Sequence, residues 1–104
     1  MLFADKVALV TGGGSGIGRA SAHAFARHGA SVGILGRTAD EIEHVASEIR
    51  ALGGSALPLV ADVKDEGAMR DAVEALVEAF GGVDIVVANA GVNGVWAPVD
   101  DLKP

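Results

Sequence analysis

The sequence predicts an α/β fold of three layers, with helices on both faces of a parallel sheet. Short apolar runs alternate along the chain with longer segments in which apolar residues recur at helical spacing. This alternation of strands and helices is typical of a parallel sheet with right-handed crossovers. Half of the 104 residues are hydrophobic, so the chain can bury the core of one small domain.

Four strands and three helices follow from the local patterns. The run from Val7 to Val10 is apolar throughout and ends at a glycine cluster, as expected of a strand that is buried on both faces. Small residues favour a closely packed helix over 16–28, and Gly29 stands at its C-terminal end. The remaining predicted strands are 31–35, 56–61 and 83–88, and the remaining predicted helices are 38–52 and 65–80.

Two local features refine this arrangement. Thr38 and Glu41 have the spacing of a capping box, which predicts the start of the second helix. Pro58 has no backbone N–H to donate, which places the third strand at an edge of the sheet. The expected strand order is 3-2-1-4. In that order strand 83–88, which is apolar on both faces, is an unprotected edge, so we expect self-association and a homo-oligomer.

Composition argues against several classes of function. The net charge of −6 opposes binding to a nucleic-acid backbone, and no apolar run approaches the roughly 20 residues that span a bilayer. We therefore expect no nucleic-acid partner, no membrane insertion and a cytoplasmic location. The chain has no cysteine, and His23, His28 and His44 show no ligand-like grouping with carboxylates, so no metal is expected.

A glycine-rich segment from Thr11 to Gly18 joins the first strand to the first helix. Helix N-terminal amides at such a junction can bind a phosphate group. A Walker-type loop is disfavoured, because Arg19 and Ala20 stand where its lysine and hydroxyl residue belong. The common dinucleotide spacing G-x-G-x-x-G has no register here. The spacing G-x-G-x-G does fit, and it keeps an S-adenosylmethionine-binding fragment open as an alternative.

The remaining spacing resembles the cofactor loop of the short-chain dehydrogenase/reductases. It is T-G-x-x-x-G-x-G, on Thr11, Gly12, Gly16 and Gly18. Two further matches follow in order and extend the resemblance over essentially the whole chain. They are Asp62-Val63 after the third strand and Asn89-Ala90-Gly91 after the fourth. The resemblance implies a Rossmann-type domain that binds a nicotinamide dinucleotide.

The resemblance also implies a role for each matching position. The residues of the glycine loop would turn the chain and face the phosphates of the cofactor, and they are Gly12, Gly14, Ser15, Gly16, Ile17 and Gly18. Asp62 would accept a hydrogen bond from the adenine amino group, and the amide of Val63 would lie on the ring. Asn89, Ala90 and Gly91 would line the ribose side of the cofactor.

The end of the second strand decides between NAD and NADP. NAD-binding Rossmann domains present an acidic residue there, which accepts from the ribose hydroxyls and repels a 2′-phosphate. Here Gly36 occupies that position, and the guanidinium of the following Arg37 is suited to a bidentate contact with a 2′-phosphate. NADP is therefore the expected cofactor and NAD the alternative. An exposed ion pair of Arg37 with Asp40 or Glu41 is the competing interpretation.

The residues that perform the family's chemistry are missing from the chain. Members use a tyrosine with a lysine four residues later, and a serine, to reduce a carbonyl group, and this sequence has no tyrosine. We therefore expect residues 1–104 to be the N-terminal part of a single NAD(P)-binding Rossmann domain, truncated after strand 4 and inactive alone. The parent would transfer hydride between NADP(H) and a small alcohol or ketone, for example as a 3-oxoacyl or other carbonyl reductase. A non-catalytic nucleotide-binding module is the alternative.

Overall fold

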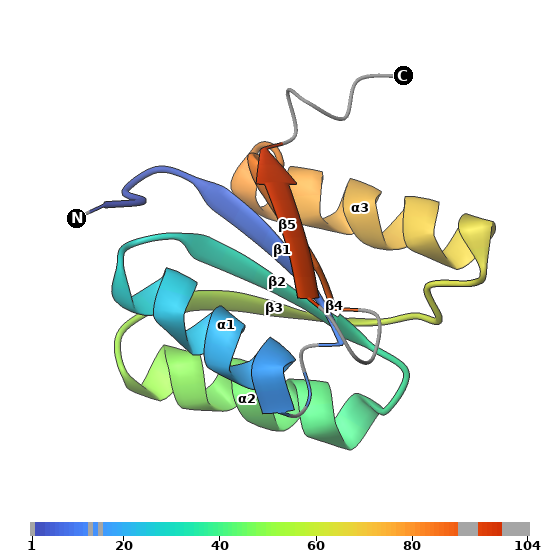
Figure 1. Cartoon of the computed structure of the whole chain (residues 1–104), viewed down its shortest axis with the longest axis horizontal. Coiled ribbons are helices and arrows are strands. Elements are labelled where there is room, and N and C mark those ends of the chain that lie inside the picture. Colours follow the sequence, from blue (N-terminus) through green and yellow to red (C-terminus); the bar gives the residue numbers. More distant parts are fainter. Residues whose placement is uncertain (1, 13, 15, 90–93, 99–104) are drawn as a thin grey trace.

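The computed structural model describes residues 2–12, 14, 16–89 and 94–98. Strands and helices alternate along the chain up to residue 89, and a further strand follows (Figure 1). The strands are β1 (Val7–Thr11), β2 (Ser31–Gly36), β3 (Ser55–Val60), β4 (Ile85–Asn89) and β5 (Gly94–Pro98), and the helices are α1 (Gly16–Arg27), α2 (Ala39–Ala51) and α3 (Glu66–Phe80). All seven elements expected from the sequence are therefore present, with ends that differ by two residues at most.

β1 lies at the centre of the sheet, between β2 and β4. The strand order is β3-β2-β1-β4-β5, and the first four strands run parallel to one another. Thr11 pairs with Leu35 of β2 and with Ala88 of β4, so these strands end together at one edge of the sheet. The predicted parallel sheet with the order 3-2-1-4 is confirmed.

The expectation that β4 forms an unprotected edge was wrong. β5 runs antiparallel to β4 and pairs with its whole length, from Ile85 opposite Pro98 to Asn89 opposite Gly94. This pairing satisfies backbone groups of β4 that an edge would leave open. The segment G-V-W-A-P is apolar but has only five residues and is bounded by glycine and proline, both of which are depleted in strands, so its strand depends on pairing with β4.

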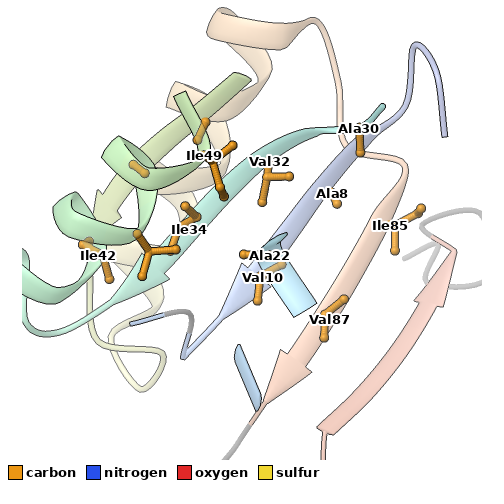
Figure 2. Packing of buried hydrophobic residues seen from close by; sticks show 13 residues of the cluster. Ala8, Val10, Ala22, Ala30, Val32, Ile34, Ile42, Ile49, Ile85 and Val87 are labelled. Carbon is orange, nitrogen blue, oxygen red and sulfur yellow. The ribbon is translucent and has the colours of Figure 1, made fainter. Parts of the chain in front are cut away.

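α1 and α2 lie on one face of the sheet (Figure 1). Alternate residues of β1, β2 and β4 point to this face and meet the apolar stripe of α2 and the small Ala22 of α1 (Figure 2). The buried cluster on this face consists of Ala8, Val10, Ala22, Ala30, Val32, Ile34, Ile42, Val45, Ala46, Ile49, Ala56, Ile85 and Val87. It holds α2 against the carboxyl ends of β2 and β3, where the site described below lies.

α3 covers the opposite face of the sheet. Its fully buried Leu76 packs with Leu9 of β1 and Leu59 of β3. The side chain of Leu76 lies directly over Gly33, since a Cβ atom on Gly33 would come within 2.7 Å of Leu76 Cδ1. β2 therefore needs a glycine at this position for α3 to approach the sheet so closely. Helices on both faces complete the three predicted layers.

The starts of α2 and α3 are capped differently. Thr38 is the N-cap of α2, but its side chain makes no capping hydrogen bond, so the predicted capping box with Glu41 was wrong. Glu41 lies instead beside the glycine loop. At α3 the N-cap is Asp65, whose carboxylate accepts a hydrogen bond from the Ala68 N–H at 3.0 Å. In the described ranges no helix combines the length and the apolarity needed to cross a bilayer.

Side-chain hydrogen bonds join β1 and β4 near both ends. The Val7 N–H donates to Asp84 Oδ2 at 2.8 Å, and the Asp84 N–H donates to the Val7 carbonyl at 2.8 Å. At the other end, Thr11 Oγ1 donates to the Val87 carbonyl at 3.3 Å. These contacts fix the register in which the carboxyl ends of β1 and β4 lie at the same edge of the sheet.

Candidate cofactor-binding site

The segment between β1 and α1 forms one wall of the candidate site. Gly12 and Gly16 have positive φ angles of 65° and 58°, a conformation that other residues rarely adopt. Glycine at these two positions lets the chain leave β1 and turn directly into α1. The first amides of α1, including those of Ile17 and Gly18, have no intrahelical carbonyl to bind. They can therefore hold a phosphate at the end of β1.

Two neighbouring hollows open at the carboxyl ends of β1, β2 and β3. The smaller hollow, of about 140 Å³, lies between the glycine loop and the start of α2. The larger hollow, of about 320 Å³, extends from the end of β2 to the segment after β3. Gly12, Gly36 and Arg37 line both hollows. The candidate site thus lies at the edge of the sheet where ligands bind in open parallel α/β folds.

Asp62 and Val63 line the larger hollow, and the resemblance described above implies that they bind adenine. The Asp62 carboxylate accepts a hydrogen bond from the Lys64 N–H at 2.9 Å, which holds its side chain in a turn beside the hollow. Asp65, not Asp62, caps α3, so Asp62 has no capping role there. Lys64 also lines this hollow, although no sequence motif pointed to it.

The remaining predicted site residues are Ser15 between β1 and α1, Asn89 at the end of β4, and Ala90 and Gly91 directly after it in the sequence. Ser15, Ala90 and Gly91 lie outside the described residues. Asn89 is the last residue of β4, one position beyond the pairing of Ala88 with Thr11, so its backbone lies at the same edge as Gly12. The structure thus brings the β1 and β4 segments together at the candidate site.

Arg37 is exposed at the boundary between the two hollows. In the part of the chain that the structure describes, it forms no ion pair with Asp40 or Glu41. The competing interpretation, in which Arg37 is occupied by one of these acids, therefore has no support. Its guanidinium is available to an anion in either hollow.

Gly36 has no room for a side chain. A Cβ atom built on it would lie 2.9 Å from Ile42 Cγ2, and Ile42 is buried in the core. An acidic residue at the end of β2 would therefore have to displace Ile42. The packing of α2 on the sheet therefore disfavours any side chain at position 36, an acidic one included.

The sequence predicts Glu41 as half of a capping box with Thr38 and as one of two acids that could pair with Arg37. In the structure it lines the smaller hollow with Arg37. A Cβ atom built on Gly14 would lie 2.8 Å from Glu41 Cβ and 3.0 Å from Glu41 Oε2. The carboxylate therefore lies against the glycine loop. This contact depends on tertiary packing, and no sequence motif predicts it.

A second polar cluster joins α1 to α2 away from the site. The Glu48 carboxylate accepts a hydrogen bond from Arg19 Nε at 3.0 Å, and His23 Nε2 and His44 Nε2 lie 3.0 and 3.4 Å from its oxygens. The sequence predicts no metal-ligating group of histidines and carboxylates, and it does not reveal this contact of His23 and His44 with Glu48, which depends on the packing of α1 against α2. The hydrogen bonds from Arg19 and then from His23 lower the pKa of Glu48 to about 2.

This cluster is an ion-pair network between two helices. The Arg19 guanidinium donates two hydrogen bonds to the Glu48 carboxylate, one to each oxygen. Among the residues described by the structure, no group of three or more His, Cys, Asp or Glu side chains is arranged to hold a metal ion. The expectation that the chain binds no metal stays a prediction.

Known proteins resemble this chain along almost its whole length. The family model for short chain dehydrogenases matches residues 6–103. A peroxisomal 2,4-dienoyl-CoA reductase of Arabidopsis thaliana is 42% identical over 99 residues, which are 95% of this chain and 33% of that protein. A short-chain dehydrogenase/reductase homolog of Bacillus subtilis, YusS, is 40% identical over 100 residues, and the match covers 95% of this chain and 91% of that protein.

Solved structures show the same relationship. A 3-ketoacyl-ACP reductase from Sinorhizobium meliloti 1021 is 65% identical with a TM-score of 0.80, over 94% of this chain and 38% of that one. A metagenomic short-chain oxidoreductase in complex with NADP is 34% identical with a TM-score of 0.81, over 88% of this chain and 42% of that one. The chain thus spans about a third of the Arabidopsis relative and about two fifths of each of these structures. Fold, loop geometry and similarity agree, and the chain belongs to the short-chain dehydrogenase family.

Proposed function

We propose that this chain is the NADP(H)-binding portion of an oxidoreductase that transfers hydride between NADP(H) and an alcohol or ketone. The family assignment supports a nicotinamide dinucleotide over S-adenosylmethionine. The 65% identity to a 3-ketoacyl-ACP reductase favours a 3-oxoacyl or similar carbonyl compound as the substrate of the complete enzyme.

The choice of NADP depends on one observation, the unpaired Arg37 at the boundary of the two hollows. A 2′-phosphate on the adenosine ribose carries a charge that this guanidinium can bind through two hydrogen bonds. Gly36 offers no carboxylate to repel it, and Ile42 leaves no space for one. The related short-chain oxidoreductase solved with NADP is consistent with this choice.

Each described site residue has a role in this proposal. The amides at the start of α1 hold the pyrophosphate, and Gly12 lets the backbone approach it closely. Asp62 accepts from the adenine amino group, while Arg37 binds the 2′-phosphate. Asn89 holds the end of β4 beside the glycine loop. The bound cofactor supplies or accepts the hydride, and these residues orient it at the carboxyl edge of the sheet.

The test compares NADPH and NADH binding to the unsubstituted chain and to Arg37→Ala by isothermal titration calorimetry. Because Arg37 is exposed, its contact with the 2′-phosphate is expected to contribute about 1 kcal/mol. Arg37→Ala should therefore shift the ratio of the NADH and NADPH dissociation constants roughly fivefold towards NADH. Arg70→Ala is the matched control, since Arg70 is an exposed arginine on α3 that lines neither hollow. Equal affinity of the unsubstituted chain for NADH and NADPH would show that the NADP assignment is wrong.

A second candidate function is binding of the dinucleotide without turnover. The observation that favours it is the Bacillus subtilis homolog, of which this chain covers 91%, so a relative of similar length exists. The 104 residues contain no tyrosine, the residue that in this family donates a proton to the carbonyl oxygen. We expect the purified 104-residue chain to bind NADPH but not to oxidise it in the presence of a 3-oxoacyl thioester. Oxidation above the rate in buffer would contradict this.

A further inference from the structure

Glu41 brings a carboxylate to the hollow that Arg37 shares. It belongs to the first turn of α2, and its Oε2 would lie 3.0 Å from a Cβ atom on Gly14. The same hollow of about 140 Å³ is lined by Gly12, Gly36 and Arg37. A negative and a positive side chain therefore line one small space beside the glycine loop.

The two charges do not neutralise each other directly. No ion pair joins Glu41 to Arg37 in the described part of the chain, and Glu41 makes no capping hydrogen bond with Thr38. Both side chains are exposed, so a ligand in the hollow meets the carboxylate and the guanidinium separately. An anion that approaches Arg37 in this hollow is also close to Glu41.

The carboxylate enters this hollow from the helix side. The end of β2 carries no acid, and Ile42 fills the space beside Gly36. Gly36 and Glu41 nevertheless line the same hollow. The start of α2 thus places the Glu41 carboxylate in the hollow beside the end of β2, where Gly36 provides no acidic side chain.

We propose that Glu41 is a specificity-determining residue that opposes Arg37, so that it limits the preference of this site for NADP(H) over NAD(H). The proposal rests on the proposed dinucleotide-binding function. The Glu41 carboxylate repels a 2′-phosphate, whereas it can accept a hydrogen bond from an unmodified ribose hydroxyl. Both effects favour NAD(H) over NADP(H). The observed preference is then the difference between the contributions of Arg37 and Glu41.

The test measures the ratio of the NADH and NADPH dissociation constants for the full chain and for Glu41→Gln. Removing one negative charge at several ångströms from a phosphate should raise this ratio about threefold to tenfold at low salt. The gain should shrink as salt is added, because the charges are exposed and screened. Glu43→Gln is the matched control, since it makes the same change in charge on the same helix at an exposed residue that lines neither hollow.

The outcomes separate this inference from the proposed function. If the unsubstituted chain binds neither NADPH nor NADH, the proposed function and this inference both fail. If it binds them and Glu41→Gln leaves the ratio unchanged or lowers it, this inference alone is overturned. An equal rise in the ratio for Glu43→Gln would also overturn it, because the effect would then come from the net charge of the helix. A salt-sensitive rise with Glu41→Gln only would support it.

Discussion

Adding a single methyl group at Gly36 tests whether packing excludes an acid from the end of β2. The Cβ atom of Gly36→Ala would lie 2.9 Å from Ile42 Cγ2, closer than two carbon atoms normally approach. Ile42 is 1% exposed and sits in the cluster formed by α2 and the sheet. It cannot move away without disturbing that cluster, so the new methyl group should strain the packing between α2 and β2.

The expected loss in stability is the difference between two effects. Overpacking a buried site costs about 1–3 kcal/mol. Gly36 has no positive φ angle, so alanine can adopt its backbone conformation. Alanine also lowers the conformational entropy of the unfolded chain, which stabilises the folded state by about 0.4–1 kcal/mol. We therefore expect Gly36→Ala to lower the free energy of unfolding by roughly 0.5–2 kcal/mol. Gly36→Asp should lose more, because its larger side chain has to leave the same crowded position.

Urea denaturation followed by circular dichroism measures this loss, and changes at Ile42 reveal its cause. Leucine lacks the Cγ2 branch, so Gly36→Ala/Ile42→Leu should recover most of the lost stability. Valine keeps a methyl branch at Cβ, so Gly36→Ala/Ile42→Val should recover none. The steric explanation is refuted if Gly36→Ala is as stable as the unsubstituted chain, or if valine at position 42 restores stability as well as leucine.

Three further substitutions test the core, the β1–β4 connection and the Glu48 cluster. Leu76→Ala should lower the free energy of unfolding by about 2–5 kcal/mol in urea denaturation, and an equal loss for the partly exposed Val77→Ala would contradict this. Asp84→Ala removes the acceptor of the Val7 N–H and should cost about 1–2 kcal/mol, with faster hydrogen exchange at Val7, whereas Asp84→Asn, which keeps an acceptor oxygen, should lose less. The pKa of Glu48 falls from 4.5 to about 2 on folding, so its stabilising effect is present above pH 4.5 and is lost as the pH falls towards 2. The urea midpoints of the unsubstituted chain and Glu48→Gln should converge over that range, and a constant difference would contradict the assignment.

The sequence predicts most of the fold because the signals for β1 to β4 and for the three helices are local. Val7 to Val10 shows the continuous apolar run of a buried strand, and the stripe containing Ile42 and Ile49 packs against the sheet as its spacing predicts. The strand β5 was not predicted because its pairing with β4 is a tertiary interaction, and a segment of five residues bounded by glycine and proline does not indicate it. The expected homo-oligomer, cytoplasmic location and absence of nucleic-acid and membrane partners stay predictions.

The sequence motifs predict part of the candidate site, but they do not predict the residues that reach it only through tertiary packing. The glycine loop follows from its position and spacing, and Asp62 follows from the resemblance to the short-chain dehydrogenase/reductases. The structure places Gly12, Arg37 and Asp62 around one hollow. The spacing of Glu41 from Thr38 predicts a capping box, and nothing in the sequence predicts its contact with the glycine loop. Lys64 belongs to no motif and lines the larger hollow only because of the turn after β3. Such site residues can be identified only from the folded structure, in which elements that are distant in sequence lie side by side.

The central position of β1 determines the order in which this domain can be completed during synthesis. β1 pairs on one side with β2, which follows after a single helix, and on the other side with β4, whose Asp84 contact spans 77 positions. As the chain emerges from the ribosome, β1, β2 and β3 can assemble with α1 and α2 while the second side of β1 is still open. Closing a loop of that length makes the docking of β4 a late and slow step. Until then the nascent chain exposes the edge of its most buried strand, which is the stage at which it is most prone to misassembly and to capture by chaperones.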